Sequence, residues 1–162
     1  MRISLIRVDD RLVHGQVLAG WARILGVQTI VVADDEAYGD TLTRSLMEAA
    51  APPGMKIIVC TVDEISRIVH AADDRSCALV LVRDPAAALR LREILPYDRL
   101  NLGGVGLAPG RSPFFRNIYL SDQERGMLKA LCDRGVEVKV QVVPSDAPVD
   151  FSQLNAKRSE TC

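Results

Sequence analysis

The chain has 162 residues, of which 48% are hydrophobic and 25% are charged, and its formal net charge is -1. This length suits one domain with a core of ordinary size, and the composition is that of a globular protein rather than a disordered one. A charge this close to zero gives no reason to expect nucleic acid or an anionic membrane as a general partner, so any phosphate site must be local.

The cysteines and the apolar runs set further limits. The four cysteines form no C-x-x-C pair and stand far apart, so neither a disulfide framework nor a zinc site is expected. No apolar run reaches the roughly 18 residues that a membrane span needs, and the first residues do not resemble a signal peptide. A reducing cytoplasm is therefore the expected location.

Short apolar segments alternate with helical patterns along the chain. The segments predicted to be strands are residues 3–8, 29–33, 56–62, 78–82, 100–105, 117–120 and 136–143. Several are apolar on both faces, as strands covered by helices on both sides are. Strand–helix alternation predicts right-handed crossovers and a mostly parallel sheet. In the last segment valines alternate with polar residues, which indicates one wet face and a place near an edge.

Helix signals fill the intervals between these strands. Residues 16–25 carry apolar side chains at helical spacing and stop at Gly26, which suits a left-handed cap. Thr61 and Ser121 each precede a glutamate by three residues, a capping-box spacing. Asp84 precedes a proline that fits a first helical turn. Asp34 and Asp35 end the second strand, where they either border the site or cap the next helix.

These patterns together predict the fold class and the domain limits. The chain is expected to be α/β, with a single open, mostly parallel seven-stranded sheet, helices on both faces, and at least one antiparallel strand near an edge. Residues 105–117 are rich in Gly and Pro and show no helix pattern. Residues 1–145 are expected to form the domain, and residues 146–162 a polar, loosely held C-terminal tail.

The segment after the first strand gathers most of the chemistry. It reads RVDDRLVHGQV over residues 7–17 and runs directly into a helix. Ligands of parallel α/β sheets bind at the carboxyl ends of strands. The neutral imidazole of His14 is a good nucleophile near neutral pH, and phosphoryl transfer otherwise needs placement and cancellation of charge. The pattern therefore favours a phosphorylated histidine, although a solvated loop with ordinary ion pairs remains the alternative.

Phosphate binding is expected from two kinds of group in this segment. Guanidinium groups offer a planar fork to phosphate oxygens, and unsatisfied amides at a helix N-terminus face an anion. The groups expected to bind the phosphate are the side chains of Arg11 and Arg7 and the backbone at Gly15, Gln16 and Val17. One aspartate, Asp10 by preference, is expected to hold the other ring nitrogen of His14 or to orient Arg11.

The sequence RVDDRLVHGQV resembles the active loop of the IIB components of the mannose/fructose/sorbose class of bacterial phosphoenolpyruvate-dependent sugar phosphotransferase systems. That pattern is approximately Arg-Ile-Asp-Asp-Arg-Leu/Phe-Ile-His-Gly-Gln-Val, and Val8 and Val13 stand here in place of isoleucine. Further similar segments are Trp21 and residues 30–35, 51–54, 100–104 and 134–138. The resemblance covers nearly all of residues 1–145 and implies a sheet of six parallel strands and one antiparallel strand.

The resemblance implies a phosphotransferase that acts as a phosphocarrier. His14 would accept a phosphoryl group through Nδ1 from a histidine of a IIA protein and pass it to a sugar held by the membrane components IIC and IID. Arg11 matches the family arginine that steadies the phosphate, and Arg7 matches a second one. No metal or other cofactor is expected, and the protein would be cytoplasmic, attached to the inner face of the membrane through IIC and IID. The sequence does not indicate which sugar is transported or what the oligomeric state is.

Two departures leave other functions open. Phe114 and Phe115 stand where polar residues are expected, and residues 151–162 show no clear closing helix. They allow a regulatory module that kept the His14 loop without transport partners. A histidine phosphatase also fits the loop chemistry, but it needs a positioned water and usually a second acid, for which there is no strong candidate. The two phenylalanines either form a docking patch or fold onto the core.

Two further features have alternative interpretations. His70 shares the polar side of its predicted helix with charged residues and is expected to be a surface histidine. The Gly103–Gly104 pair lacks the G-x-G-x-x-G spacing of a nucleotide loop. It is expected to be either a close backbone neighbour of the His14 loop or a tight turn.

Overall fold

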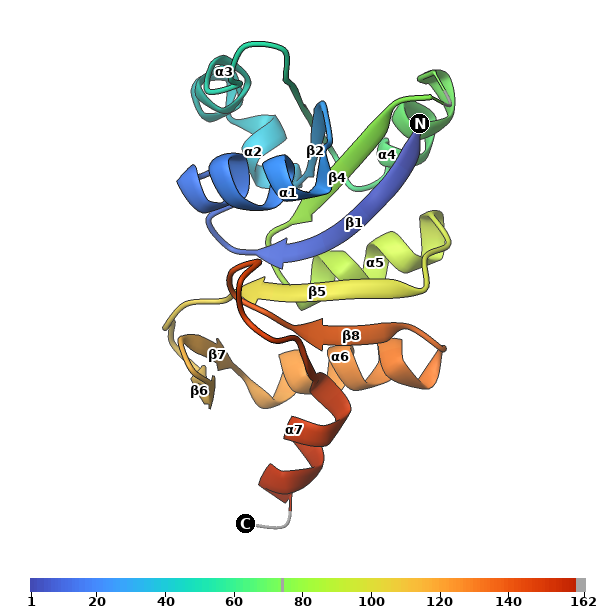
Figure 1. The fold of residues 1–162 in the computed structure, drawn as a ribbon. Coiled ribbons are helices and arrows are strands. Elements are labelled where there is room, and N and C mark those ends of the chain that lie inside the picture. The colour runs from blue at the N-terminus through green and yellow to red at the C-terminus, as the bar shows by residue number, and fades with distance from the viewer. Residues whose placement is uncertain (74, 160–162) are drawn as a thin grey trace.

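A seven-stranded sheet forms the centre of the molecule, with helices on both of its faces (Figure 1). The computed structural model describes residues 1–73 and 75–159. Across the sheet the strands are β3 (Lys56–Cys60), β2 (Thr29–Ala33), β4 (Cys77–Val82), β1 (Arg2–Asp9), β5 (Arg99–Gly104), β8 (Glu137–Val140) and β9 (Val149–Asp150). Every neighbouring pair is parallel except β8 and β9, which are antiparallel. The predicted open, mostly parallel sheet with an antiparallel edge is confirmed.

The membership of the sheet differs from the prediction in one strand. Residues 117–120 do not join the sheet, because β7 (Ile118–Leu120) pairs with β6 (Ser112–Phe115) in a separate two-stranded hairpin. The short strand β9 takes the seventh place instead. With two residues it is too short to show a strand pattern of its own, and pairing with β8 is what makes it a strand.

Helical segments cover both faces of the sheet (Figure 1). They are η1 (Gln16–Ala22, π-helical), α1 (Arg23–Leu25), α2 (Asp35–Gly39), α3 (Thr41–Ala49), α4 (Ile65–Ala71), α5 (Pro85–Ile94), α6 (Asp122–Asp133) and α7 (Phe151–Ser159). Gly26 ends the first helical segment with a φ of 62°. The Asp84 side chain caps α5, and Ser121 and Glu124 form a capping box at α6. Asp34 caps α2, which was one of its two expected roles.

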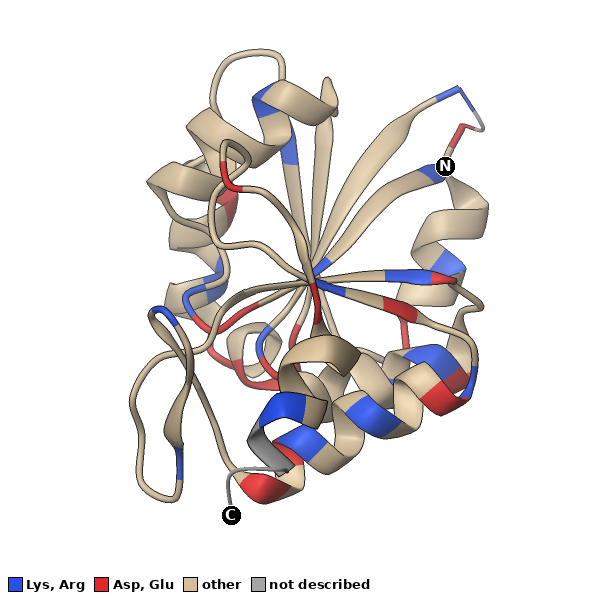
Figure 2. Cartoon of the chain, turned by 60° about the horizontal axis from the view of Figure 1, so that its bottom comes forward, with Lys and Arg blue, Asp and Glu red and all other residues tan. Residues whose placement is uncertain are grey.

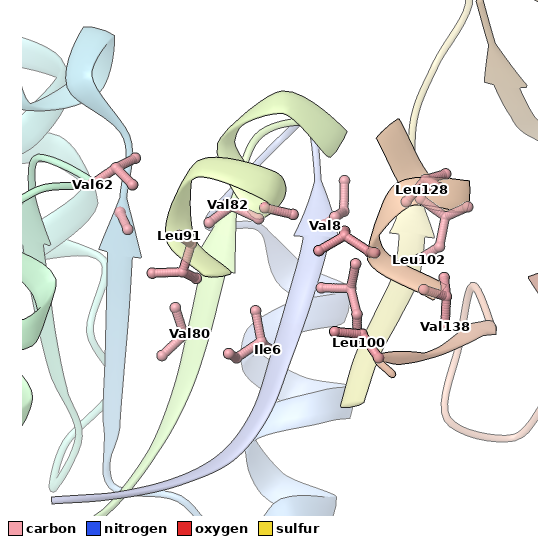
Figure 3. Packing of buried hydrophobic residues seen from close by; sticks show 14 of the residues in the cluster. Ile6, Val8, Val62, Val80, Val82, Leu91, Leu100, Leu102, Leu128 and Val138 are labelled. Carbon is pink, nitrogen blue, oxygen red and sulfur yellow. The ribbon is translucent and has the colours of Figure 1, made fainter. Parts of the chain in front are cut away.

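Alternating side chains of the strands build two cores, one on each face. Ile6 and Val8 of β1 lie with Val80 and Val82 of β4 beneath Leu91 of α5 (Figure 3). Leucines 79 and 81 of β4 point the other way and pack under η1, α1 and α2. Burying one such side chain fully contributes about 1.5–3 kcal/mol. The sheet is therefore fixed from both sides, and the loops at its ends rest on a rigid base.

The C-terminal segment is folded, contrary to the expectation of a loosely held tail. After β9 the chain forms α7, and Phe151 at its start is only 1% exposed. The rings of Phe151 and Phe114 lie 5.4 Å apart between centroids. Phe114 thus folds onto the core, as one of its two interpretations held. Residues 160–162 of the predicted tail lie outside the described residues.

The surface carries charges of both signs. Figure 2 shows basic and acidic residues interspersed over the helices rather than separated onto opposite sides of the molecule. Among residues 1–73 and 75–159, each helix is too short or too polar to pass through a bilayer.

Candidate functional site

The chain connections diverge at the carboxyl end of β1. The connection after β1 leads to η1 on one face of the sheet, whereas the connections after its neighbours β4 and β5 lead toward α5 and α6 on the other face. Connections that diverge from adjacent parallel strands leave a crevice that is the usual ligand site of open α/β sheets. Residues 10–15, which contain His14, lie at this point.

His14 is oriented by a buried carboxylate. Its Nε2 lies 3.1 Å from Oδ2 of Asp9, whose side chain is 0% exposed, while the His14 side chain is 14% exposed. Among the described residues none forms a hydrogen bond with Nδ1 of His14. A carboxylate on Nε2 favours the tautomer with the proton on that nitrogen. The lone pair of the ring is then on Nδ1, the nitrogen that was expected to accept the phosphoryl group.

Asp9 keeps its negative charge in spite of its burial. Burial alone would raise the pKa of Asp9, but the hydrogen bond from His14 and the charge of Arg7 outweigh it. The pKa of this carboxyl therefore lies below its ordinary value. A permanent anion beneath the ring can stabilise positive charge that develops on the imidazole.

The aspartate that contacts the His14 ring is Asp9 and not Asp10. The carboxylate of Asp10 accepts a hydrogen bond from the Gly106 amide over 2.6 Å and lies 3.7 Å from the Arg111 guanidinium. It fastens the His14 loop to the loop after β5 and makes no contact with His14 that the structure records. The preference for Asp10 as the ring partner was wrong, because the last residue of β1 points its side chain to the ring and the next one points away.

Arg7 is not placed to bind a phosphate. Its side chain is 1% exposed, and its guanidinium donates to Asp9 over 2.8 Å and to the carbonyls of Gln141 and Val142 over 3.1 and 3.0 Å. A further hydrogen bond goes to Asn101. Since every nitrogen of the group is occupied inside the protein, Arg7 holds Asp9 rather than an incoming anion. The expectation of a phosphate ligand is corrected accordingly.

The indole of Trp21 completes the surroundings of Arg7. The guanidinium carbon of Arg7 lies 4.8 Å from the centre of the Trp21 ring, and Nε1 of Trp21 donates to the Val142 carbonyl over 3.3 Å. A cation over a desolvated aromatic face is stabilised by the ring quadrupole. The sequence placed Trp21 on the apolar face of its predicted helix and among the residues that match the family, but nothing in its spacing pointed to this contact.

Arg11 is an exposed cation of the loop. Its side chain is exposed, and its guanidinium donates to Oε1 of Gln16 over 3.2 Å. A surface hydrogen bond of this kind is weak enough to be exchanged for a phosphate. The structure thus leaves Arg11 available for the role expected of it.

The amide cradle is smaller than predicted. Within the described residues the amides of Gly15 and Gln16 donate no hydrogen bond, so both remain available to an anion. The Val17 amide instead donates to the His14 carbonyl over 3.0 Å, and the Val17 side chain is fully buried. Val17 therefore anchors the helix and does not bind phosphate. Leu12, buried with a φ of 54°, bends the loop back over the sheet.

His70 lies away from this site. Its Nδ1 is 2.6 Å from the carbonyl oxygen of Ser66 in the same helix, and the side chain is exposed. The prediction of a surface histidine is confirmed.

The fold and the site define a class of α/β protein in which a buried carboxylate presents a histidine at the switch point of an open parallel sheet. The profile of the family described as "PTS system sorbose subfamily IIB component" matches residues 3–161. The chain belongs to this family.

Individual relatives agree with this assignment. The chain is 30% identical over 153 residues to the sorbose-specific EIIB component of Klebsiella pneumoniae, with 93% of each protein covered. It is also 30% identical over 161 residues to the mannose-specific EIIAB component of Escherichia coli (strain K12), covering 97% of this chain and 49% of that protein. The crystal structure of the IIBSor domain of the sorbose permease from Klebsiella pneumoniae superposes with a TM-score of 0.90, at 30% identity and with 97% and 98% of the two chains covered.

The function of the class follows from this membership. The chain is a phosphocarrier subunit of a sugar phosphotransferase system, and its activity is that of a phosphotransferase. IIB components work with IIA proteins and with the membrane components IIC and IID.

Proposed function

We propose that His14 carries the phosphoryl group, on Nδ1. The observation that supports this most directly is the 3.1 Å contact between Nε2 of His14 and the buried Asp9, which leaves Nδ1 as the nucleophilic nitrogen. The donor is a phosphohistidine of a IIA protein, and the acceptor is a sugar hydroxyl presented by IIC and IID. The EIIAB relative, whose name joins an A and a B component, supports a IIA donor.

The transfer onto His14 balances without an added acid or base. The Nδ1 lone pair attacks phosphorus as the N–P bond of the donor histidine breaks, and the electron pair of that bond stays with the donor ring. The His14 ring then carries a positive charge, with its Nε2 proton still directed at Asp9. Asp9 stabilises this charge, while Arg11 and the amides of Gly15 and Gln16 face the phosphate oxygens.

The second transfer reverses these changes. A sugar hydroxyl attacks phosphorus, the N–P bond breaks, and its electron pair returns to Nδ1 of His14. The hydroxyl proton leaves to a base outside this chain, since among the described residues the acidic side chain recorded against the ring is Asp9 of β1, which already accepts from Nε2. On this proposal the protein works in the cytoplasm, at the inner face of the membrane, through contact with IIC and IID.

The regulatory alternative has lost its support. It depended on Phe114, Phe115 and an unstructured C-terminal segment. Phe114 packs on Phe151, and the guanidinium of Arg116 lies 5.4 Å from the centre of the Phe115 ring. Residues 151–159 form a helix. These departures belong to the packing of the fold and indicate nothing about partners.

Labelling of two histidine variants tests the proposal. With a phosphorylated IIA protein as donor, His14→Ala should abolish incorporation, and the matched variant His70→Ala should label like the wild type. The label should be stable in base and labile in acid, as a phosphoramidate is. Incorporation that survives His14→Ala would refute the assignment.

A further inference from the structure

Two glycines at the end of β5 stand where side chains of β1 need space. A Cβ atom at Gly103 would lie 1.9 Å from Cζ of Arg7 and 2.1 Å from its nearer terminal nitrogen. A Cβ atom at Gly104 would lie 2.8 Å from Oδ1 of Asp9. Real Cβ atoms do not approach other atoms this closely, so each position accepts only glycine while Arg7 and Asp9 stay in place.

The gap at Gly103 gives Arg7 a path across the sheet. Strand β5 lies between β1, which carries Arg7, and β8, whose end precedes the carbonyl groups that Arg7 reaches. The guanidinium therefore passes over the backbone of β5 at the residue that has no side chain. From this position it donates to Asp9 on one side and to Gln141 and Val142 on the other.

The Arg7 guanidinium is enclosed by the protein. It is 1% exposed and lies between the Trp21 ring and its hydrogen-bond partners. A methyl group at position 103 would displace it and remove hydrogen bonds on which the orientation of the Asp9 carboxylate depends. The effect would then reach His14, because Asp9 contacts Nε2 of that ring.

We propose that Gly103 is a positioning residue for phosphoryl transfer, acting through Arg7 and Asp9 to set which nitrogen of His14 carries the proton. Gly104 acts on the same chain of contacts one residue further on, directly at Asp9. The inference rests on the proposed function, since it takes His14 as the reacting group.

A matched pair of glycine variants tests this inference. Gly103→Ala should slow transfer from a phosphorylated IIA protein by about 10- to 100-fold, the usual effect of displacing a reacting group by about an ångström. In the free protein, ¹⁵N NMR of the His14 ring should show that the Nε2-protonated form no longer dominates. Gly126→Ala, on an exposed helix position with no atom within 4 Å of the added Cβ, should match the wild type in both measurements.

A double variant separates positioning from a general structural effect. In Arg7→Ala the guanidinium is absent, so adding Gly103→Ala should change neither the transfer rate nor the His14 spectrum further. Additive losses would overturn the proposal, and so would a Gly103→Ala variant with the wild-type spectrum and rate.

The proposal can still be tested if Gly103→Ala does not fold. Should Gly103→Ala fail to fold, the double variant should fold as well as Arg7→Ala does, because the clash has been removed; a double variant that is less stable than Arg7→Ala would refute the clash. If wild-type protein is not labelled on His14, the proposed function fails, while the ring spectra still decide the role of Gly103.

Discussion

Oδ2 of Asp9 accepts a hydrogen bond from Nε2 of His14 over 3.1 Å, and this carboxylate has no access to solvent. The His14 ring is therefore held through Nε2 by a buried carboxylate, and among the described residues Nδ1 has no recorded hydrogen-bond partner. Asp9 is part of strand β1, whereas His14 lies on the loop that follows. The strand thus fixes the orientation of a ring that the loop carries.

Asp9→Asn should slow phosphoryl transfer much more than Asp10→Asn. The amide keeps the shape of the side chain but loses a charge-assisted hydrogen bond worth about 1.5–3 kcal/mol, which corresponds to about 10- to 100-fold in rate. Asp10→Asn changes only the link to the loop after β5. Rates measured with saturating phosphorylated IIA protein decide the point. Equal rates for the two variants would mean that Asp9 does not support the ring during transfer.

The acid stability of the fold should depend on Asp9. Because its pKa in the folded protein lies below the ordinary value of 3.8, Asp9 contributes stability that is present above that pH and is lost as the pH falls toward the folded pKa. The difference in free energy of unfolding between wild type and Asp9→Asn should therefore be largest near neutral pH and shrink below about pH 4. Urea unfolding at several pH values measures it. A difference that stays constant down to about pH 2 would contradict the depressed pKa.

Arg11→Lys should slow transfer, and Arg11→Ala should slow it more. A guanidinium can bridge two phosphate oxygens, whereas an ammonium is a point charge without that fork. Both variants should keep the free energy of unfolding of the wild type within about 0.5 kcal/mol, because the side chain is exposed and its recorded hydrogen bond goes to Gln16 at the surface. Wild-type transfer by Arg11→Ala would show that Arg11 is merely a partner of Gln16.

Arg7→Ala should chiefly lower the free energy of unfolding. It leaves the buried Asp9 carboxylate without its cation, and breaking a buried pair in this way costs about 3–5 kcal/mol. Arg7→Lys should restore only part of this, since one ammonium cannot reach all the partners of the guanidinium. Chemical denaturation of the two variants measures the effect. If Arg7→Ala kept the wild-type stability and lost only transfer, Arg7 would have to be a ligand of the phosphate instead.

Periodicity and capping signals were sufficient for most of the fold. The apolar runs located the six parallel strands, and local signals at Gly26, Asp84 and Ser121 located helix ends. These features are set by neighbouring residues, so the sequence expresses them directly. The strand β9 and helix α7 were missed because they depend on contacts with β8 and with Phe114, which no local pattern records.

In the site, too, local features could be predicted from the sequence and features that depend on tertiary contacts could not. His14 could be found from its loop, because the clustering of charged residues there is local. The roles of Asp9 and Asp10 could not be separated, since adjacent residues differ only in the direction of their side chains at the end of β1. The burial of Arg7 depends on Gly103, Asn101 and the carbonyls after β8, which come together only in the folded sheet.

The strand β9 also affects how the sheet edge could pair with a second copy of the chain. Without it, β8 would present a row of unpaired amides and carbonyls, the usual template on which a second chain adds a strand. The Val149–Asp150 strand pairs with Lys139 and Val140 in that row, and the Lys139 ammonium lies 2.8 Å from the Asp150 carboxylate across the pair. At only two residues, β9 offers little edge of its own to extend. The C-terminal segment thereby shortens the free edge on this side of the sheet to which a second chain could add a strand.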